Sequence, residues 1–279
     1  MAKENYTGLD PHQLAFIKAV KEMAHAKRPH EVFRDFCELA ALSFSCAVDW
    51  IQAEQREERY RQVVASYPAT EVRRFSELLG YIVESLGDHM HDALGEIFMA
   101  MDLGSHWHGQ FFTPYPVAQM MGAMVAPSGP AALPESGFQS VCEPAVGAGA
   151  MVIAMADAML SAKINYQQCM HVFAIDIDPL AVHMAYIQFS LLHIPAVVFH
   201  GNTITAEMHS YWLTPAHVLG LWDLRLRKTD TEAAPQPVEA FEIPASQPQT
   251  RDAPAVLASA RDEVVSRRIE VGAQLGLFD

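Results

Sequence analysis

Residues Glu143–Gly149 read Glu-Pro-Ala-Val-Gly-Ala-Gly, and the segments on either side of them decide the fold. Phe138–Glu143 is a short run suited to a buried strand, and Ala148–Ala162 is strongly helical. A glycine loop between a strand and a helix lets the backbone approach a ligand closely. The start of the helix adds the positive end of its dipole. The sequence therefore predicts a ligand-binding turn inside an α/β unit.

The alternation of strands and helices continues after this loop. His171–Asp176 and Ala196–His200 are short runs typical of buried parallel strands, and Pro179–His193 between them is strongly helical. Such alternation indicates right-handed βαβ units in a doubly wound sheet. We therefore expect an α/β, Rossmann-like domain over residues 105–227.

The rest of the chain differs on both sides of this domain. Asp10-Pro11, Pro29 and Pro68 each open a segment with apolar residues at helical spacing, so residues 1–104 predict a helical region. Residues 228–254 are polar and punctuated by prolines, which predicts a disordered linker. Residues 255–279 are expected to hold a short helix and an apolar tail.

Composition and charge restrict the class of protein. Hydrophobic residues make up 51% of the chain, which excludes wholesale disorder, and no uncharged apolar run is long enough to span a membrane. The four cysteines show no CxxC spacing and the amino terminus has no signal-peptide pattern, so we expect a cytoplasmic protein with reduced thiols. The net charge is −14, and Lys163, Arg225 and Arg227 are the only lysines or arginines in residues 101–227. Contacts with DNA phosphates would therefore have to come from lysines and arginines of the helical region or from a partner.

The acidic residues at the strand ends indicate which ligand the loop binds. A dinucleotide loop would follow the pattern G-x-G-x-x-G, but position 152 is Val, and Glu143 stands four positions before the first glycine. A carboxylate there can hold the amino group of a methionine moiety, whereas it would repel a pyrophosphate. Asp176, at the end of the second strand, is placed to accept both ribose hydroxyls. The pattern predicts S-adenosylmethionine rather than NAD; the alternative is a tight turn without a ligand.

Three motifs in order resemble the N6-adenine DNA methyltransferases, and most of all the modification subunit of type I restriction systems. Gly109–Pro114 reads Gly-Gln-Phe-Phe-Thr-Pro, which is similar to the family's entry motif. Glu143–Gly149 is similar to its Asp-Pro-x-x-Gly-x-Gly loop, with Glu for Asp, and Asp176–Pro179 to its third element. Asp92–Glu96 resembles the helix before the entry motif. The resemblance covers roughly residues 90 to 205.

The resemblance implies roles for individual residues. Gln110, Phe112 and Thr113 would line the methionine end of the cofactor, and Glu143, Pro144, Gly147 and Gly149 would hold its amino-acid part. Asp176 would bind the ribose, and Ile177 would lie against the adenine. Asn202 stands where the family has an Asp that meets the adenine amino group, which leaves a weaker acceptor.

The family's target-base motif, Asn/Asp-Pro-Pro-Tyr/Phe, is absent from the sequence. It accepts hydrogen bonds from the amine of a flipped adenine and stacks a ring on the base. The nearest analogue is Tyr211–His217, in which Tyr211 or Trp212 could stack on a base with His217 as polar partner. Alternatively, these residues are packing that closes a shortened sheet. No clear fourth to seventh strand follows, so we expect a truncated core without an identified catalytic residue.

Two remaining motifs concern metals and partners. His106 and His108 share one loop without a third ligand, so no metal site is expected. The tail residues Gln274, Leu275, Leu277 and Phe278 resemble a bacterial sliding-clamp-binding peptide at the end of a tether. Alternatively, the tail folds back onto its own domain.

The function indicated is an S-adenosylmethionine-binding protein of the N6-adenine DNA methyltransferase type, acting in DNA modification. If it is catalytic, it is an adenine-specific transferase. The alternatives are a non-catalytic regulator or partner subunit of a modification, restriction or anti-restriction system, and an enzyme acting on S-adenosylmethionine itself. The partners expected are DNA, met indirectly or with a partner's help, the sliding clamp, and a second copy or a modification-system subunit.

Overall fold

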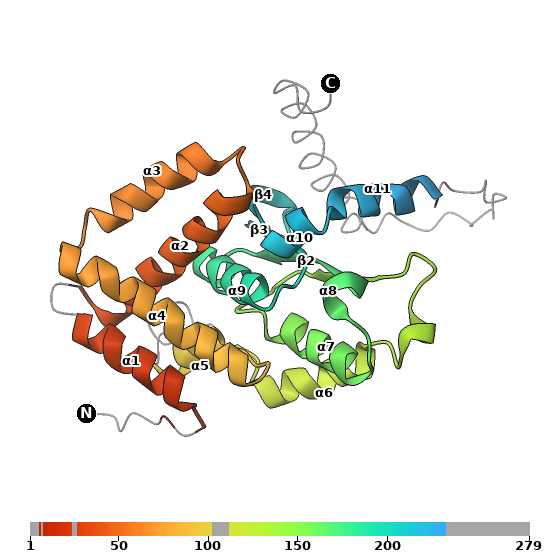
Figure 1. Ribbon diagram of the computed structural model, residues 1–279, viewed down its shortest axis with the longest axis horizontal. Coiled ribbons are helices and arrows are strands. Elements are labelled where there is room, and N and C mark those ends of the chain that lie inside the picture. Colours follow the sequence, from red (N-terminus) through yellow and green to blue (C-terminus); the bar gives the residue numbers. More distant parts are fainter. Residues whose placement is uncertain (1–5, 7, 24–26, 102–111, 233–279) are drawn as a thin grey trace, which may run out of the picture.

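The computed structural model describes residue 6 and residues 8–23, 27–101 and 112–232 (Figure 1). Five helices come first: α1 (Pro11–Met23), α2 (Pro29–Val48), α3 (Ala53–Val64), α4 (Ala69–Asp88) and α5 (Ala93–Ala100). Then follow α6 (Tyr115–Val125), η2 (Pro130–Ala132), β1 (Gln139–Glu143), α7 (Ala150–Ser161), α8 (Tyr166–Cys169) and β2 (Met170–Asp176). The series ends with α9 (Pro179–Leu191), β3 (Ala196–Asn202), β4 (Glu207–Leu213), α10 (Pro215–Leu219) and α11 (Trp222–Glu232).

The predicted helical region is confirmed, and its helices begin where the prolines stand. Asp10 caps α1, because its Oδ1 accepts the backbone N–H groups of His12 at 2.7 Å and Gln13 at 2.8 Å. Pro29 is the first residue of α2, and Pro68 directly precedes α4. One helix of this region, α3, is mostly polar and carries no apolar stripe that would reveal it in the sequence.

The sheet has the order β1-β2-β3-β4. The first three strands are parallel, so their carboxyl ends meet at one edge, with Glu143 opposite Ala174 and Asp176 opposite His200. Together with the helical region, this confirms the predicted α/β, Rossmann-like class. The expectation of no clear fourth strand was wrong, because β4 pairs antiparallel with β3.

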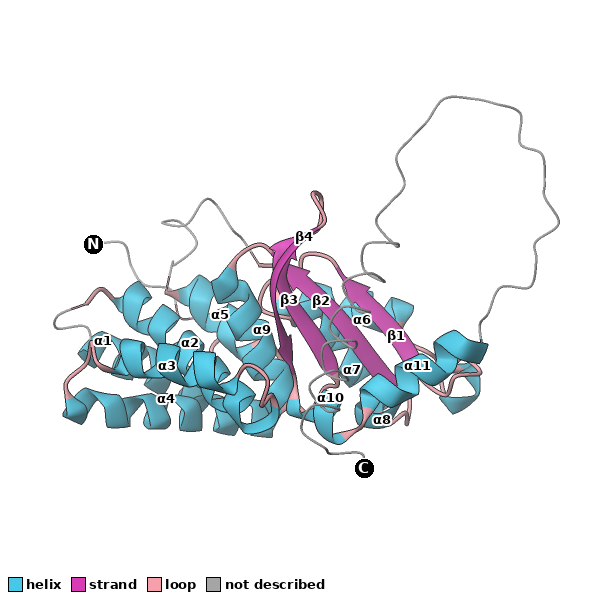
Figure 2. Cartoon of the chain, turned by 90° about the horizontal axis from the view of Figure 1, so that it is seen from above, coloured by secondary structure: helices cyan, strands magenta, loops and turns pink. Residues whose placement is uncertain are grey.

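Helix α9 joins the helical region to the sheet. It is buried on almost every side, with α2 and α5 against one flank and β2 and β3 against the other. One apolar core therefore runs from the helices through α9 to the sheet. Figure 2 shows β4 beside the helical region and β1 farthest from it. On the opposite face of the sheet, Trp222 of α11 packs edge-on against Phe138.

No helix in the described parts of the chain is long and apolar enough to cross a membrane.

Candidate cofactor site

The glycine loop has a backbone that only glycine adopts freely. Gly147 has φ +55° and Gly149 has φ +106°, both in the left-handed region. A Cβ on Gly149 would lie 2.7 Å from the ring of Phe189, and one on Gly147 would lie 3.0 Å from the ring of Phe112. The two glycines therefore allow the backbone to turn and allow the rings of Phe112 and Phe189 to contact the loop directly.

Asp176 fixes this loop to the end of β2. Its Oδ2 accepts the N–H of Gly147 at 2.8 Å, and its Oδ1 accepts the N–H of Asp178 at 3.0 Å. Burial raises the pKa of Asp176, while these backbone donors oppose the rise. Each oxygen retains acceptor capacity for a further donor, such as a hydroxyl.

Glu143 supplies a second carboxylate at the same edge of the sheet. Its Oε1 accepts the N–H of Ala145 at 3.3 Å, and its pKa is raised by burial and by the charge of Asp176. Two partly buried carboxylates whose charges repel are stabilised by a cation or by several hydrogen-bond donors. The site thus suits a ligand with an ammonium group and hydroxyls, and the amino-acid part and ribose of S-adenosylmethionine meet that requirement.

The buried amide of Gln188 links the glycine loop to the start of α5. This role was not predicted from the sequence. Its Nε2 donates to the Ala148 carbonyl at 2.7 Å and to Asp92 Oδ1 at 2.8 Å, while its Oε1 accepts the N–H of Leu94 at 3.2 Å. Asp92 also accepts the N–H of Gly95 at 3.0 Å and so caps α5. Burial raises the pKa of Asp92 to about 6. The only signal for Gln188 in the sequence is an amide inside an apolar helix.

The entry motif lies against the loop only in part. Phe112 packs on Phe98, with ring centroids 4.9 Å apart, and covers Gly147. Thr113 is exposed, just before the start of α6. Gln110 lies outside the described residues.

The remaining predicted cofactor residues also gather at this edge. Ile177 is 59% exposed, so an apolar surface is open to solvent next to Asp176. Thr203 Oγ1 donates to the Pro144 carbonyl at 2.7 Å and ties the β3–β4 turn to the loop. Asn202 Oδ1 accepts the N–H groups of Ile204 at 2.9 Å and Thr205 at 3.3 Å. The amide oxygen expected to meet an adenine amino group therefore already stabilises a turn.

Tyr211, Trp212 and His217 do not join the two carboxylates. Trp212 is buried against His183, with ring centroids 4.9 Å apart. His217 Nδ1 lies 2.9 Å from Nε2 of His171, which stands at the start of β2, five positions before Asp176. At about 3.3 Å per residue, that places His171 roughly 16 Å along the strand from Asp176. His217 therefore lies at the opposite end of the sheet.

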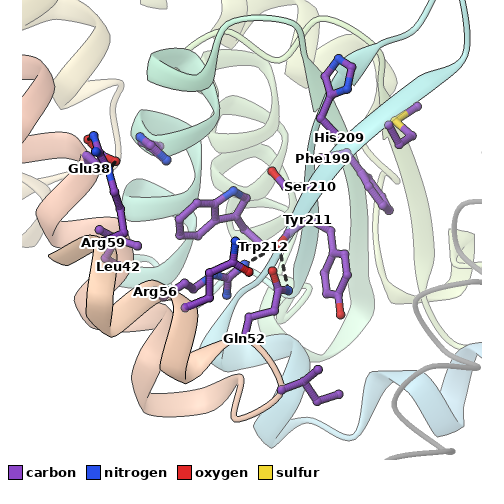
Figure 3. Close-up of a pocket in the computed structure, with 14 residues that line it drawn as sticks. Glu38, Leu42, Gln52, Arg56, Arg59, Phe199, His209, Ser210, Tyr211 and Trp212 are labelled. Carbon is purple, nitrogen blue, oxygen red and sulfur yellow. Dashed lines mark hydrogen bonds and ion pairs between the residues drawn. The ribbon is translucent and has the colours of Figure 1, made fainter. Parts of the chain in front are cut away.

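A groove with a volume of about 610 Å³ runs along the outer edge of β4 (Figure 3). Tyr211 and Trp212 line it, together with Gln52, Arg56 and Arg59 from α3 and the residues just before it. The Arg56 guanidinium lies 4.2 Å from the Trp212 ring centroid and donates to the Tyr211 carbonyl at 2.6 Å. These contacts close the edge of the sheet, which favours the packing interpretation of Tyr211 and Trp212.

No group of three or more His, Cys, Asp or Glu side chains in the described ranges could hold a metal ion. His106 and His108 lie outside those ranges, and so do the tail residues Gln274, Leu275, Leu277 and Phe278.

One family model matches part of the chain. Residues 89–220, a little under half of the chain, match the model of the N-6 DNA Methylase family. No curated protein matches the chain.

Three solved structures are distantly similar. A putative class I S-adenosylmethionine-dependent methyltransferase from Listeria monocytogenes is 13% identical, with a TM-score of 0.35, over 68% of this chain and 53% of that one. A DrdV–DNA complex is 14% identical, with a TM-score of 0.35, over 70% of this chain and 22% of that one. The type I restriction-modification methyltransferase subunit from Streptococcus thermophilus is 18% identical, with a TM-score of 0.32, over 66% of this chain and 38% of that one. The chain thus spans about half or less of the length of each.

The matched segment begins just before Asp92 and ends just after His217, so it includes the glycine loop, both carboxylates and the Gln188 network. Residues 89–220 therefore carry the sequence pattern of the N-6 DNA methylase family.

Proposed function

We propose that this protein binds S-adenosylmethionine and acts in DNA modification as a protein of the N6-adenine DNA methyltransferase type. One observation carries the proposal. Two partly buried carboxylates, Glu143 and Asp176, flank a glycine loop at the carboxyl edge of a parallel sheet, within the segment that matches the family. Such an edge is where open α/β sheets bind their ligands.

The residues would divide the cofactor between them. Glu143 would hold the methionine amino group, and Asp176 would accept the ribose hydroxyls while it keeps Gly147 in place. The exposed face of Ile177 would lie against the adenine. The bound cofactor would supply the methyl group, and the protein's own contribution would be to position it.

Calorimetric titration with S-adenosylmethionine tests this proposal. We expect Asp176→Ala to weaken binding by about 1.5–3 kcal/mol, the scale of a hydrogen bond to a charged group. Asp88→Ala, at an exposed acid on the last residue of α4, is the matched control and should bind like the wild type. Equal melting temperatures would show that both variants fold. No binding by the wild type at millimolar cofactor would refute the proposal.

A second candidate is a non-catalytic regulator or partner subunit of a modification, restriction or anti-restriction system. The absence of Asn-Pro-Pro, Asp-Pro-Pro or Ser-Pro-Pro from the sequence favours it, because no other feature of the described residues positions an adenine amine. Incubation with methyl-labelled cofactor, with and without adenine-containing DNA, separates the candidates. Label in DNA indicates a methyltransferase, and cofactor breakdown without DNA indicates an enzyme acting on S-adenosylmethionine. Binding without either indicates a regulator.

We also propose that Gln274–Phe278 binds a sliding clamp. The support is the sequence resemblance alone. Clamp binding would bring an acidic protein to DNA without a basic patch. An anchor of two apolar side chains suggests micromolar affinity, near −8 kcal/mol. Leu277→Ala with Phe278→Ala should abolish clamp binding and leave cofactor binding unchanged. If that double variant instead unfolds more readily, the tail packs on its own domain.

A further inference from the structure

Helix α6 presents a stripe of large apolar side chains to solvent. The exposed fractions are 43% for Val117, 61% for Met120, 43% for Met121, 78% for Met124 and 65% for Val125. Their spacing is i, i+3, i+4, i+7 and i+8, which in a soluble protein is the spacing of a helix face that packs on a partner. We call these five residues the α6 stripe.

The opposite face of α6 is already packed, so the stripe is a second apolar face. Tyr115, Ala118 and Gly122 are buried, and α6 packs on α7. A Cβ on Gly122 would lie 2.8 Å from the Ala154 carbonyl carbon, so the two helices are in backbone contact there. The helix therefore cannot rotate to bury the stripe against its own domain.

Helix α6 and the residues that directly follow it carry no charged side chain. Residues 115–134 contain no Asp, Glu, Lys, Arg or His, although the chain as a whole has a net charge of −14. A partner recognised by its charges would find nothing to pair with on α6. Two copies of this acidic chain would repel each other over most of their surfaces but not here.

The two edges of the sheet differ in whether other parts of the chain cover them. On β4, the outer edge is capped, because Arg56 and Gln52 donate to the Tyr211 carbonyl at 2.6 and 3.5 Å. On β1, the outer edge has no neighbouring strand among the described residues, and Ser140 and Cys142 are exposed. Monomeric proteins usually block such an edge with charged side chains, proline, a bulge or a very short strand. The sequence of β1, Gln-Ser-Val-Cys-Glu, has no lysine or proline, and its one charged residue, Glu143, stands at the end of the strand.

The stripe and the open edge lie on the same side of the molecule. Helix α6 packs on α7, which connects β1 to β2, and Figure 2 shows both helices near β1 and β2, away from helices α1–α4. Helix α6 therefore lies toward the β1 end of the sheet.

We propose that this side is the contact between two copies of the chain. A two-fold axis perpendicular to the sheet would pair β1 antiparallel with its partner's β1 and would join the two sheets into one. The same rotation keeps both α6 helices on one face, where their stripes meet over the junction. One symmetry operation thus covers both exposed features, as an isologous contact requires. The proposal does not depend on the cofactor.

Residues 233–254 of the same chain are one alternative occupant of this edge, and their sequence is less suited to pairing with β1. Pro235, Pro237, Pro244, Pro248 and Pro254 lack the N–H that a strand ladder uses.

Light scattering on the full chain tests the proposal. At tens of micromolar, the wild type should have about twice the 30.9 kDa mass of one chain. Met120→Glu with Met124→Glu should raise the dimer dissociation constant by about 100-fold or more, because it buries charges without partners. Both side chains are exposed in the single chain, so the variant should still fold. Trp50→Glu with Val83→Glu is the matched control. Its side chains are 74% and 45% exposed on the helical region, and its mass should equal that of the wild type.

Crosslinking at Cys142 tests the strand half of the contact. Cys142 is the exposed one of the four cysteines, so a short bismaleimide should link two copies at this position, and Cys142→Ser should prevent it. A monomeric wild type, or a dimer that is insensitive to the α6 charges, would overturn the proposal. So would hydrogen exchange that shows α6 and β1 equally protected at all concentrations, because a segment of the same chain would then cover them.

Discussion

At the scale of single residues, the buried carboxyl of Asp92 leads to a prediction about how the stability of the fold depends on pH. Burial raises its pKa to about 6, from an ordinary value of 3.8. The folded state therefore holds the proton more tightly than the unfolded state does. The stability that Asp92 contributes is complete below pH 4 and is lost as the pH rises through about 6. Asn lacks this titration and retains an acceptor for Gly95 and Gln188. From about pH 4 to 7, the free energy of unfolding of Asp92→Asn should rise relative to the wild type by up to about 3 kcal/mol.

Urea unfolding at several pH values measures this difference. Asp88→Asn, at an exposed position, should give a difference from the wild type that changes little with pH. If the curve for Asp92→Asn runs parallel to that of the wild type across this range, Asp92 is already ionised in the folded protein. Gln188 would then be holding a charged carboxylate.

At the scale of elements, replacing either of two helical glycines with alanine should change the stability of the fold, in opposite directions. A Cβ on Gly122 would lie 2.8 Å from the Ala154 backbone, so Gly122→Ala must push α6 away from α7. We expect it to lower the free energy of unfolding by about 1–3 kcal/mol. A Cβ on Gly80, in α4, would meet nothing within 4 Å. Gly80→Ala should therefore raise the free energy of unfolding by about 0.5–1 kcal/mol through helix propensity alone. Thermal or urea unfolding of the two variants tests both expectations. If Gly122→Ala also stabilises the protein, α6 and α7 are not in backbone contact at Gly122.

The same scale shows what the sequence could and could not reveal. The parallel strands and the glycine loop were predictable, because apolar runs and glycines are local signals. Strand β4 was missed, because Glu207, His209 and Ser210 interrupt the apolar run expected of a buried strand. The Gln188 network was missed for another reason. Its partner Asp92 is 96 positions away, and only the fold brings the two together.

At the scale of the whole molecule, the pairing of its charges predicts weak DNA binding. Several cations of the helical region, which we considered as possible phosphate contacts, lie beside acids. Lys27 contacts Asp35 at 2.6 Å, Arg59 contacts Glu38 at 2.5 Å, and Arg74 contacts Glu22 at 2.7 Å. Phosphate binding would have to break these pairs and to overcome a net charge of −14.

We therefore expect no saturable binding of mixed-sequence duplex DNA by the isolated chain at near-physiological salt, up to tens of micromolar protein. Fluorescence anisotropy with a labelled duplex measures it, and a salt titration gives the number of phosphate contacts from its slope. Reversing one pair, Glu38→Lys, frees Arg59 and adds a cation beside it, so this variant should bind more tightly than the wild type. A wild type that already binds at micromolar concentration with a steep salt slope would mean that the ion pairs open on DNA. A helper protein or clamp would then be unnecessary for this chain to reach its substrate.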